Sequence, residues 1–311
     1  MSKTHWTAYW QTGALTSLPM DFKANYDGEL EKYWQSVLLK STIEPLTVLD
    51  VCTGNGAIAL LLQELADKLD VKIEVTAIDA SDIDPSNILK SHPDKAEYIP
   101  LINFIGNCLV EDMSATIEQK FDLIVSQYGI EYCDTDLAAR NVTQLLKPDG
   151  NLVFVAHSPD TAMHEYMQTE EAIYQYLEQI EILDAFKRFG YNHLTVNGFK
   201  NKLQKGLDAM SKQLEYRPNS LFQTWGNAAM QLYEMNNSVL KTQRDSVKGF
   251  TIKYLHARAR AQDMLNVTDK LLNQKDWYLT FEQYGLKLEN HDEIIYQQKH
   301  NVGHFYEFSQ V

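Results

Sequence analysis

Leu46-Thr47-Val48-Leu49-Asp50-Val51-Cys52-Thr53-Gly54-Asn55-Gly56 is the stretch of this 311-residue chain that decides its fold. An apolar, strand-like run enters a turn with two glycines, and a leucine-rich helical pattern over Ala57–Leu69 follows. Glycine has no Cβ, so such a turn can bring its backbone against a polar ligand. The start of the next helix offers unpaired N–H groups to a carboxylate or phosphate. The stretch therefore predicts a strand–turn–helix unit that binds a nucleotide-like ligand.

Short apolar segments alternate with helical patterns up to about residue 160, which indicates a parallel sheet covered on both faces. A helix is expected over Gly28–Lys40 and another over Leu137–Leu146. At the end of the chain two strand-like runs are joined by a short loop, which predicts an antiparallel pair. The predicted strands are Thr47–Val51, Ile73–Ile78, Ile102–Ile105, Phe121–Ser126, Asn151–Ala156, Leu286–Gln297 and Val302–Phe308.

Only helical stripes are found between about residue 161 and residue 275, and this block is too long for a plain crossover. We therefore expect an α/β fold: a doubly wound, seven-stranded mixed sheet with a large all-helical insertion before the C-terminal β-hairpin. The sheet domain is predicted to comprise residues 28–160 and 276–311, and the insertion (residues 161–275) to cap a binding site at the carboxyl ends of the strands. The aromatic-rich residues 1–27 are expected to be irregular, with Tyr9 and Trp10 either forming a lid or packing on the insertion.

The composition limits the classes of partner. The formal net charge of −14 repels phosphate backbones, so nucleic acid is a poor expectation. No apolar run approaches the roughly 18 residues of a membrane span, and the N-terminus lacks the apolar core of a signal peptide. The three cysteines show no metal-ligand spacing and indicate reduced thiols in a cytoplasm. We therefore expect a cytoplasmic protein without membrane or metal association.

Two acidic residues help to define the ligand of the glycine turn. Asp50 precedes the first glycine, where a carboxylate suits a cationic amino group, although it can also cap the turn. Asp79 ends the second predicted strand, where it can accept hydrogen bonds from both ribose hydroxyls. Gly54-Asn55-Gly56 with Ala59 also satisfies the loose pattern of nicotinamide sites, so an NAD-dependent oxidoreductase stays an alternative.

Taken in order, the motifs resemble those of the class I S-adenosylmethionine (SAM)-dependent methyltransferases, over roughly residues 28–160 and 276–311. Asp50–Gly56 looks like the family's D-x-x-x-G-x-G signature, and Thr76-Ala77-Ile78-Asp79 looks like its second-strand acidic motif. Phe121–Tyr128 resembles the fourth-strand motif. Leu145–Leu152 resembles L-L-K-P-G-G-x-L, with Asp149 in place of a glycine.

The resemblance implies SAM as the cofactor and methyl transfer by in-line displacement. It implies that the glycine turn holds the carboxylate of the cofactor, Asp50 its ammonium and Asp79 its ribose. Gly106-Asn107-Cys108 stands where the family often has an Asp-Ala pair at the adenine, and either Asn107 or Cys108 could fill that place. The cofactor-binding residues implied in this way are Asp50, Thr53, Gly54, Gly56, Asp79, Ala80, Asn107, Cys108 and Gln127.

The acceptor is expected at the carboxyl ends of the fourth and fifth strands, because ligands of open α/β sheets bind there. The candidates for catalysis are Tyr128, Glu131 and His157. His157 could be a general base or a neutral hydrogen-bonding residue, and Glu131 could instead be a charge at a helix start. The acidic balance favours a small-molecule acceptor, whose identity and reacting atom stay open, as does the oligomeric state. A non-catalytic SAM-binding protein is a further alternative.

Overall fold

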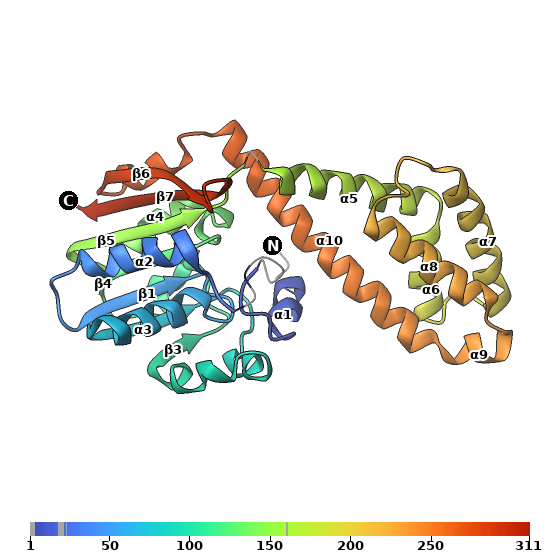
Figure 1. Cartoon of the computed structure of the whole chain (residues 1–311), viewed down its shortest axis with the longest axis horizontal. Helices are drawn as coiled ribbons and strands as arrows, with labels where there is room; N and C mark the ends of the chain where they lie inside the picture. The colour runs from blue at the N-terminus through green and yellow to red at the C-terminus, as the bar shows by residue number, and fades with distance from the viewer. Residues whose placement is uncertain (1–3, 18–21, 23, 160) are drawn as a thin grey trace. The chain divides into compact units, whose positions relative to one another are not determined.

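The computed structural model describes residues 4–17, 22, 24–159 and 161–311. It divides into two compact units, one of Met1–Thr161 with Val267–Val311 and one of Ala162–Asn266. The second unit ends at residue 266, earlier than the expected residue 275, because helix α10 (Arg244–Asn273) continues across the boundary. Figure 1 shows the sheet in the first unit and only helices in the second. That the helical unit acts as a cap stays a prediction.

The first unit holds a seven-stranded mixed sheet in the order β3-β2-β1-β4-β5-β7-β6. Strands β1 to β5 pair in parallel, whereas β7 pairs antiparallel with both β5 and β6. This confirms the predicted α/β class and the terminal hairpin. The strands are β1 Leu46–Val51, β2 Ile73–Ile78, β3 Ile102–Ile105, β4 Phe121–Gln127, β5 Leu146–Ala156, β6 Leu286–Tyr296 and β7 His300–Gln310.

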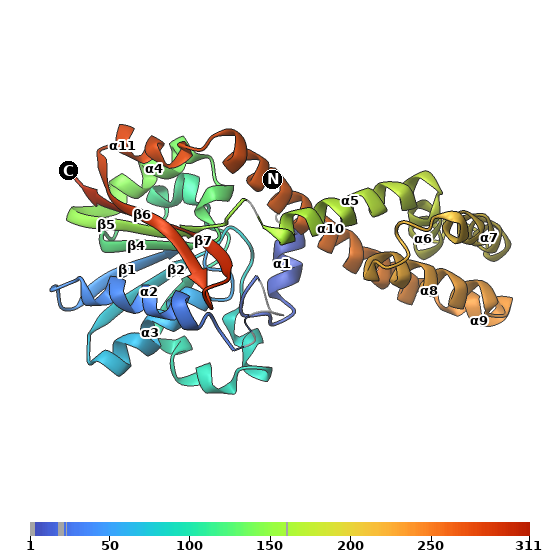
Figure 2. The ribbon, with the colours of Figure 1, turned by 45° about the horizontal axis from the view of Figure 1, so that its top comes forward.

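Side chains alternate between the two faces of the sheet and supply two apolar cores. Val48 of β1 belongs to the core under α2 (Gly28–Leu39) and α3 (Ala57–Leu69), whereas Leu49 belongs to the core under α4 (Thr135–Leu145). Figure 2 shows α2 and α3 on one side of the sheet and α4 with α11 (Thr280–Gln283) on the other. All residues of β1 and β4 are buried, as in the interior of a parallel sheet.

Three segments differ from the expectation. Thr4–Trp10 forms a helix, α1, although the segment was expected to be irregular. Helix α4 begins at Thr135, two residues before the predicted start, because the Asp134 side chain accepts a hydrogen bond from the Leu137 N–H and caps it. Strand β5 begins at Leu146, five residues before the predicted start at Asn151, because a register shift against β4 accommodates residues 147–150. Residues 1–3, 18–21 and 23 of the N-terminal segment lie outside the described residues.

Short 3₁₀ helices make up much of the connections of the first unit. The three between β2 and β3 each have a Pro at the first or second position, where the missing N–H costs no hydrogen bond. One of them, η5, follows β4 and carries a candidate site residue. They are η1 Pro85–Lys90, η2 Pro93–Glu97, η3 Ile99–Leu101, η4 Val110–Ala115, η5 Ile130–Tyr132 and η6 Trp277–Leu279.

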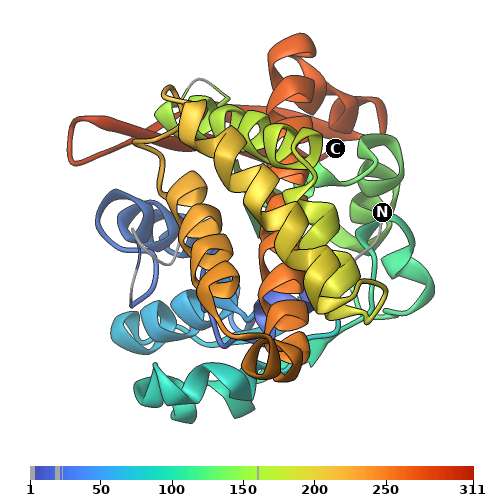
Figure 3. The same cartoon turned by 90° about the vertical axis from the view of Figure 1, so that its right-hand side faces the viewer.

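The helical unit has its own apolar core. Figure 3 shows the helices of this unit turned toward the viewer. Phe186 packs edge-on against Trp225, and Phe189 stacks on Phe199 with ring centroids 4.1 Å apart. Arg258 donates two hydrogen bonds to the Glu171 carboxylate, at 2.6 and 2.9 Å. Besides α10, its helices are α5 Ala162–Gln179, α6 Ile182–Gly190, α7 Val196–Lys212, α8 Ser220–Glu234 and α9 Asn237–Thr242. Throughout the parts of the chain that the structure describes, the helices are too short or too polar to cross a bilayer.

Candidate functional site

The backbone of the turn between β1 and α3 has a left-handed conformation that residues other than glycine rarely adopt. Gly54 and Gly56 have φ angles of 56° and 87°, and Cys52 has a φ of 59° in the same left-handed region. The Thr53 N–H donates to the Ile78 carbonyl at 2.9 Å, which ties the turn to the end of β2. The turn is therefore a fixed backbone surface at the carboxyl ends of two neighbouring strands.

Asp50 lies beneath this turn and is 1% exposed. Its Oδ2 accepts hydrogen bonds from the Thr53 hydroxyl at 2.5 Å and from the Ala59 N–H, in the first turn of α3, at 3.1 Å. Burial away from water raises the pKa of Asp50 to about 7, although both hydrogen bonds act in the opposite direction. A cation placed beside this carboxyl would therefore stabilise its charged form.

Asp79 connects the ends of β1 and β2. Its Oδ2 accepts from the Gly54 N–H at 2.8 Å, and its Oδ1 accepts from the Ser81 N–H at 2.7 Å. Ala80 lies between these two residues and is partly buried. The carboxylate is thus fixed by two backbone groups, next to the glycine turn.

The turn after β3 reaches the same place. The Cys108 N–H donates to the Asp79 carbonyl and the Asn107 N–H donates to the Ser81 carbonyl, both at 2.9 Å. Asn107 has a φ of 57° and an exposed side chain, whereas Cys108 is buried. Between the two residues that could flank an adenine, the exposed side chain is that of Asn107.

The end of β4 contributes Gln127 and Tyr128. Gln127 is buried, and its Oε1 accepts from the Trp34 indole N–H at 2.6 Å. The Tyr128 hydroxyl donates to the Val302 carbonyl of β7 at 2.5 Å. Burial raises the pKa of Tyr128 well above its ordinary value. Tyr128 therefore offers its ring rather than its hydroxyl to this region.

Glu131 and His157 form a direct pair between η5 and the end of β5. Glu131 Oε1 lies 2.7 Å from His157 Nδ1 and also accepts from the His157 main-chain N–H at 3.0 Å. Glu131 is 0% exposed, and the rings of Tyr128 and Tyr132 lie 4.5 and 5.8 Å from the His157 ring. Glu131 is thus a buried partner of His157 and also lies in the first turn of η5.

Two residues of this site, Asn55 and Ser81, are not among the sequence-predicted ones, whereas Trp10 was expected either in a lid or in a contact with the insertion. A Cβ added at Gly54 would lie 2.5 Å from the Trp10 ring, so this ring covers the glycine turn. Asn55 donates from its side-chain amide to the carbonyls of Trp10 and Ala14, at 2.8 and 2.7 Å. The aromatic residues at the N-terminus predict a lid, but no sequence pattern identifies Asn55 as the residue that anchors this segment.

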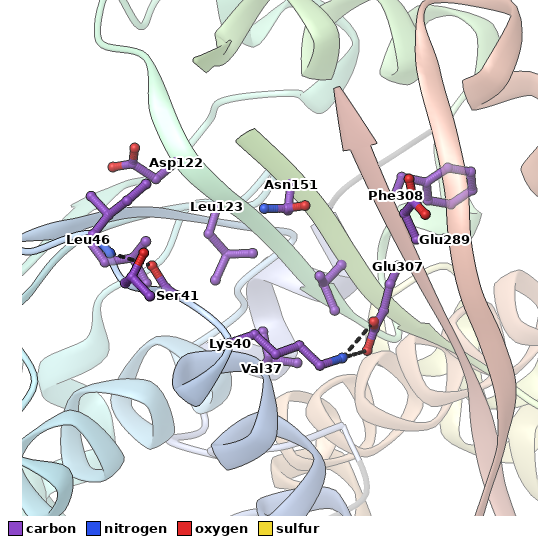
Figure 4. Close-up of a pocket in the computed structure, with 13 residues that line it drawn as sticks. Val37, Lys40, Ser41, Leu46, Asp122, Leu123, Asn151, Glu289, Glu307 and Phe308 are labelled. Carbon is purple, nitrogen blue, oxygen red and sulfur yellow. Dashed lines mark hydrogen bonds and ion pairs between the residues drawn. The ribbon is translucent and has the colours of Figure 1, made fainter. Parts of the chain in front are cut away.

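A cavity of about 320 Å³ lies elsewhere in the first unit, at the amino ends of β1 and β4 (Figure 4). Its rim includes the ion pair of Lys40 with Glu307, 2.7 Å apart, and Asp122, which pairs with Lys147 at 2.8 Å. None of the sequence-predicted site residues lines it. The cavity is therefore separate from the candidate site, which lies at the carboxyl ends of the strands.

The side chains at the carboxyl ends of β1, β2 and β3 fit SAM in chemical type. SAM presents an ammonium, a carboxylate, two ribose hydroxyls and an adenine. The site offers the buried carboxyl of Asp50, the fixed carboxylate of Asp79, a backbone turn in a left-handed conformation and the exposed amide of Asn107.

The model of a methyltransferase domain matches residues 24–196, which is more than half of the chain. No curated protein matches. Among solved structures, N-methyltransferase NodS from Bradyrhizobium japonicum is 13% identical, with 91% of this chain and 98% of that chain covered and a TM-score of 0.39. TrmN from Thermus thermophilus is 20% identical, with 48% and 42% covered and a TM-score of 0.32.

A protein from Rhodobacter sphaeroides, assigned as a zinc-dependent alcohol dehydrogenase, is 13% identical, with 99% and 98% covered and a TM-score of 0.44. The chain spans 33%, 42% and 49% of the lengths of three matched structures. At these identities and TM-scores, no solved structure supports an activity or an acceptor for this chain. The family match extends over the glycine turn, both acids and the pair of Glu131 with His157.

Proposed function

Because the chain belongs to the methyltransferase-domain family, of the class I SAM-dependent type, we propose that it transfers the methyl group of SAM to a small-molecule acceptor. The observation that carries the proposal is the convergence of two acids on one turn. Asp50 lies beneath the turn, and Asp79 bonds to its Gly54 N–H. Such a turn suits a ligand with a cationic amino acid at one end and a ribose at the other.

Each part of the ligand has a partner in this proposal. Asp50 holds the ammonium, directly or through water, and the backbone of Thr53, Gly54 and Gly56 faces the carboxylate. Asp79 orders the ribose. The remaining predicted residues, Ala80, Asn107, Cys108 and Gln127, flank the adenine and the methionine part.

When bound, SAM supplies an electrophilic methyl group on a sulfonium and leaves as S-adenosylhomocysteine. The residues of the chain have to align the acceptor with this methyl group and exclude water. The buried ends of β4 and β5 and the Trp10 ring over Gly54 are suited to the second task.

The charge of the chain supports a small-molecule acceptor. With a formal net charge of −14, the protein as a whole repels the phosphate backbones of RNA and DNA. A neutral or cationic small molecule meets no such barrier.

Calorimetric titration with SAM, S-adenosylhomocysteine and NAD tests the cofactor, and incubation of a metabolite extract with methyl-labelled SAM tests the acceptor class. We expect binding of the first two ligands and label in a low-molecular-weight product. Binding of NAD without SAM would instead establish an oxidoreductase. Binding of SAM without transfer to any extract fraction would favour a non-catalytic protein. Transfer of label to macromolecules, when a whole-cell extract replaces the metabolite extract, would overturn the acceptor class.

A further inference from the structure

We propose that Glu131 and His157 form an acid–base pair for the acceptor, with His157 Nε2 as the base and Glu131 as its positioning residue. The inference rests on the proposed methyl transfer and narrows its acceptor to a nucleophile that still carries a proton, on oxygen or nitrogen. Thiolates and carboxylates need no such base at neutral pH.

The pair is built so that one ring nitrogen is engaged and the other is not. Glu131 Oε1 lies 2.7 Å from Nδ1, and the same oxygen accepts the His157 main-chain N–H at 3.0 Å. These contacts fix the ring relative to the end of β5. A carboxylate at Nδ1 favours the tautomer with the proton on Nδ1, which leaves a lone pair on Nε2.

Two buried polar atoms of the pair have no hydrogen-bond partner among the described residues: His157 Nε2 and Glu131 Oε2. Buried polar groups are normally satisfied, and each exception calls for an explanation. The Glu131 side chain is fully buried, so this is not the pattern of a solvated surface pair. A polar ligand at the ends of β4 and β5 would supply the absent partners.

The pair of Glu131 and His157 also lies next to the glycine turn. A Cβ at Gly129, two residues before Glu131, would clash with Cys52 Cβ in the glycine turn. Aromatic contacts run from His157 to Tyr132, at 5.8 Å, from Tyr132 to Trp6, at 6.3 Å, and from Trp6 to Trp10, at 6.1 Å. Trp10 covers Gly54. The glycine turn proposed to bind SAM and the proposed base therefore belong to one contiguous cluster of residues.

In the proposed reaction the acceptor gains a methyl group and loses a proton. The proton moves from the acceptor atom to His157 Nε2, and the electron pair of the broken carbon–sulfur bond stays on sulfur. The resulting imidazolium faces the Glu131 carboxylate, which stabilises its positive charge. The proton leaves to solvent after the product departs.

Several groups face the pair and bear on its pH dependence. Tyr128 and Tyr132 border the His157 ring, and Lys270 donates to the Glu131 carbonyl at 3.1 Å. Burial raises the pKa of Tyr306, and the neighbouring Tyr278 and the Glu131 charge add to this shift.

The test compares His157→Asn, which keeps a donor near the position of Nδ1, with His157→Gln and Glu131→Gln. Turnover is measured at saturating SAM with a panel of phenols, primary amines, thiols and carboxylates, from pH 5.5 to 9. We expect turnover of the phenols and amines to rise with pH in the wild type, because the ring must be neutral. Both His157 variants should lose about 10²- to 10⁴-fold in kcat together with this pH limb, and Glu131→Gln about tenfold to a hundredfold.

Folding and cofactor binding are followed separately, by thermal unfolding and by calorimetry with SAM. Imidazole ¹⁵N chemical shifts should place the proton on Nδ1 in the wild type and on a mixture of both nitrogens in Glu131→Gln. Unchanged kcat and pH profile in a folded His157→Asn would overturn the inference, as would turnover of thiols and carboxylates alone. Absence of SAM binding by the wild type would instead defeat the proposed function.

Discussion

Asp79 Oδ2 accepts a hydrogen bond from the Gly54 N–H at 2.8 Å and so joins the end of β2 to the turn that follows β1. The two residues are 25 positions apart in the sequence. Because β1 and β2 are parallel neighbours, their carboxyl ends meet at one edge of the sheet. The carboxylate therefore shapes the turn, and in the proposed function it also contacts the ribose of the bound SAM.

Replacing Asp79 by Asn should lower the affinity for SAM about tenfold to a hundredfold, because charge-assisted hydrogen bonds to the ribose contribute about 1.5–3 kcal/mol. Calorimetric titration measures the effect. Glu74→Gln is the matched control, since Glu74 is exposed near the amino end of the same strand. Equal affinities of the two variants would place the ribose elsewhere.

SAM binding should be coupled to ionisation of Asp50. Its pKa of about 7 means that the ligand-free protein carries a proton there below neutral pH, and an ammonium beside it would expel this proton. The affinity should then fall about tenfold per pH unit below pH 7. Calorimetry in buffers of different ionisation enthalpy should detect a released proton, and Asp50→Asn should abolish both effects.

Ionisation of Asp50 should have the opposite effect on the stability of the ligand-free protein, which it lowers as the pH rises. The folded-state pKa of Asp50 lies above the ordinary value of 3.8 for an aspartate, so the protonated carboxyl stabilises the ligand-free fold at low pH. This contribution is lost as the pH rises from about 4 through about 7. Asp50→Asn should therefore remove part of the decline in Tm between pH 5 and pH 8, which thermal melts without ligand measure. An identical decline in both proteins would show that Asp50 is ionised throughout.

Gly54→Ala should weaken SAM binding and lower stability by about 1–3 kcal/mol. The new Cβ requires a left-handed φ of 56° and meets the Trp10 ring at 2.5 Å, so the backbone is strained and α1 is displaced. Chemical denaturation and quenching of tryptophan fluorescence report the two effects. Gly249→Ala is the control, because a Cβ there meets nothing within 4 Å and alanine favours the helix.

Cys52 and Cys133 should form a disulfide when the purified protein is treated with diamide, which takes up the two electrons and two protons that the thiols lose. Their Sγ atoms are 3.8 Å apart in the reduced protein. Peptide mapping by mass spectrometry without reductant identifies the link. Cys108, which is buried, serves as the internal control. A link that involves Cys108, or none after full oxidation, would contradict the packing of the turns after β1 and β4.

The sequence by itself determined the sheet and the position of the glycine turn. Strands such as Ile73–Ile78 and Ile102–Ile105 are short apolar runs between breakers, so local pattern fixes their limits. The glycines and the two acids at strand ends predict a site, because the carboxyl ends of parallel strands share one edge.

Only the tertiary structure decided which of these residues touch. Glu131 and His157 are 26 positions apart and pair because β4 and β5 are neighbours, and Cys52 meets Cys133 over 81 positions. Helix α1 was not foreseen, since seven residues are too few to form a stable helix alone and α1 is held through Asn55. Local periodicity is written in neighbouring residues, whereas such contacts depend on how distant segments pack, which no short stretch of sequence specifies.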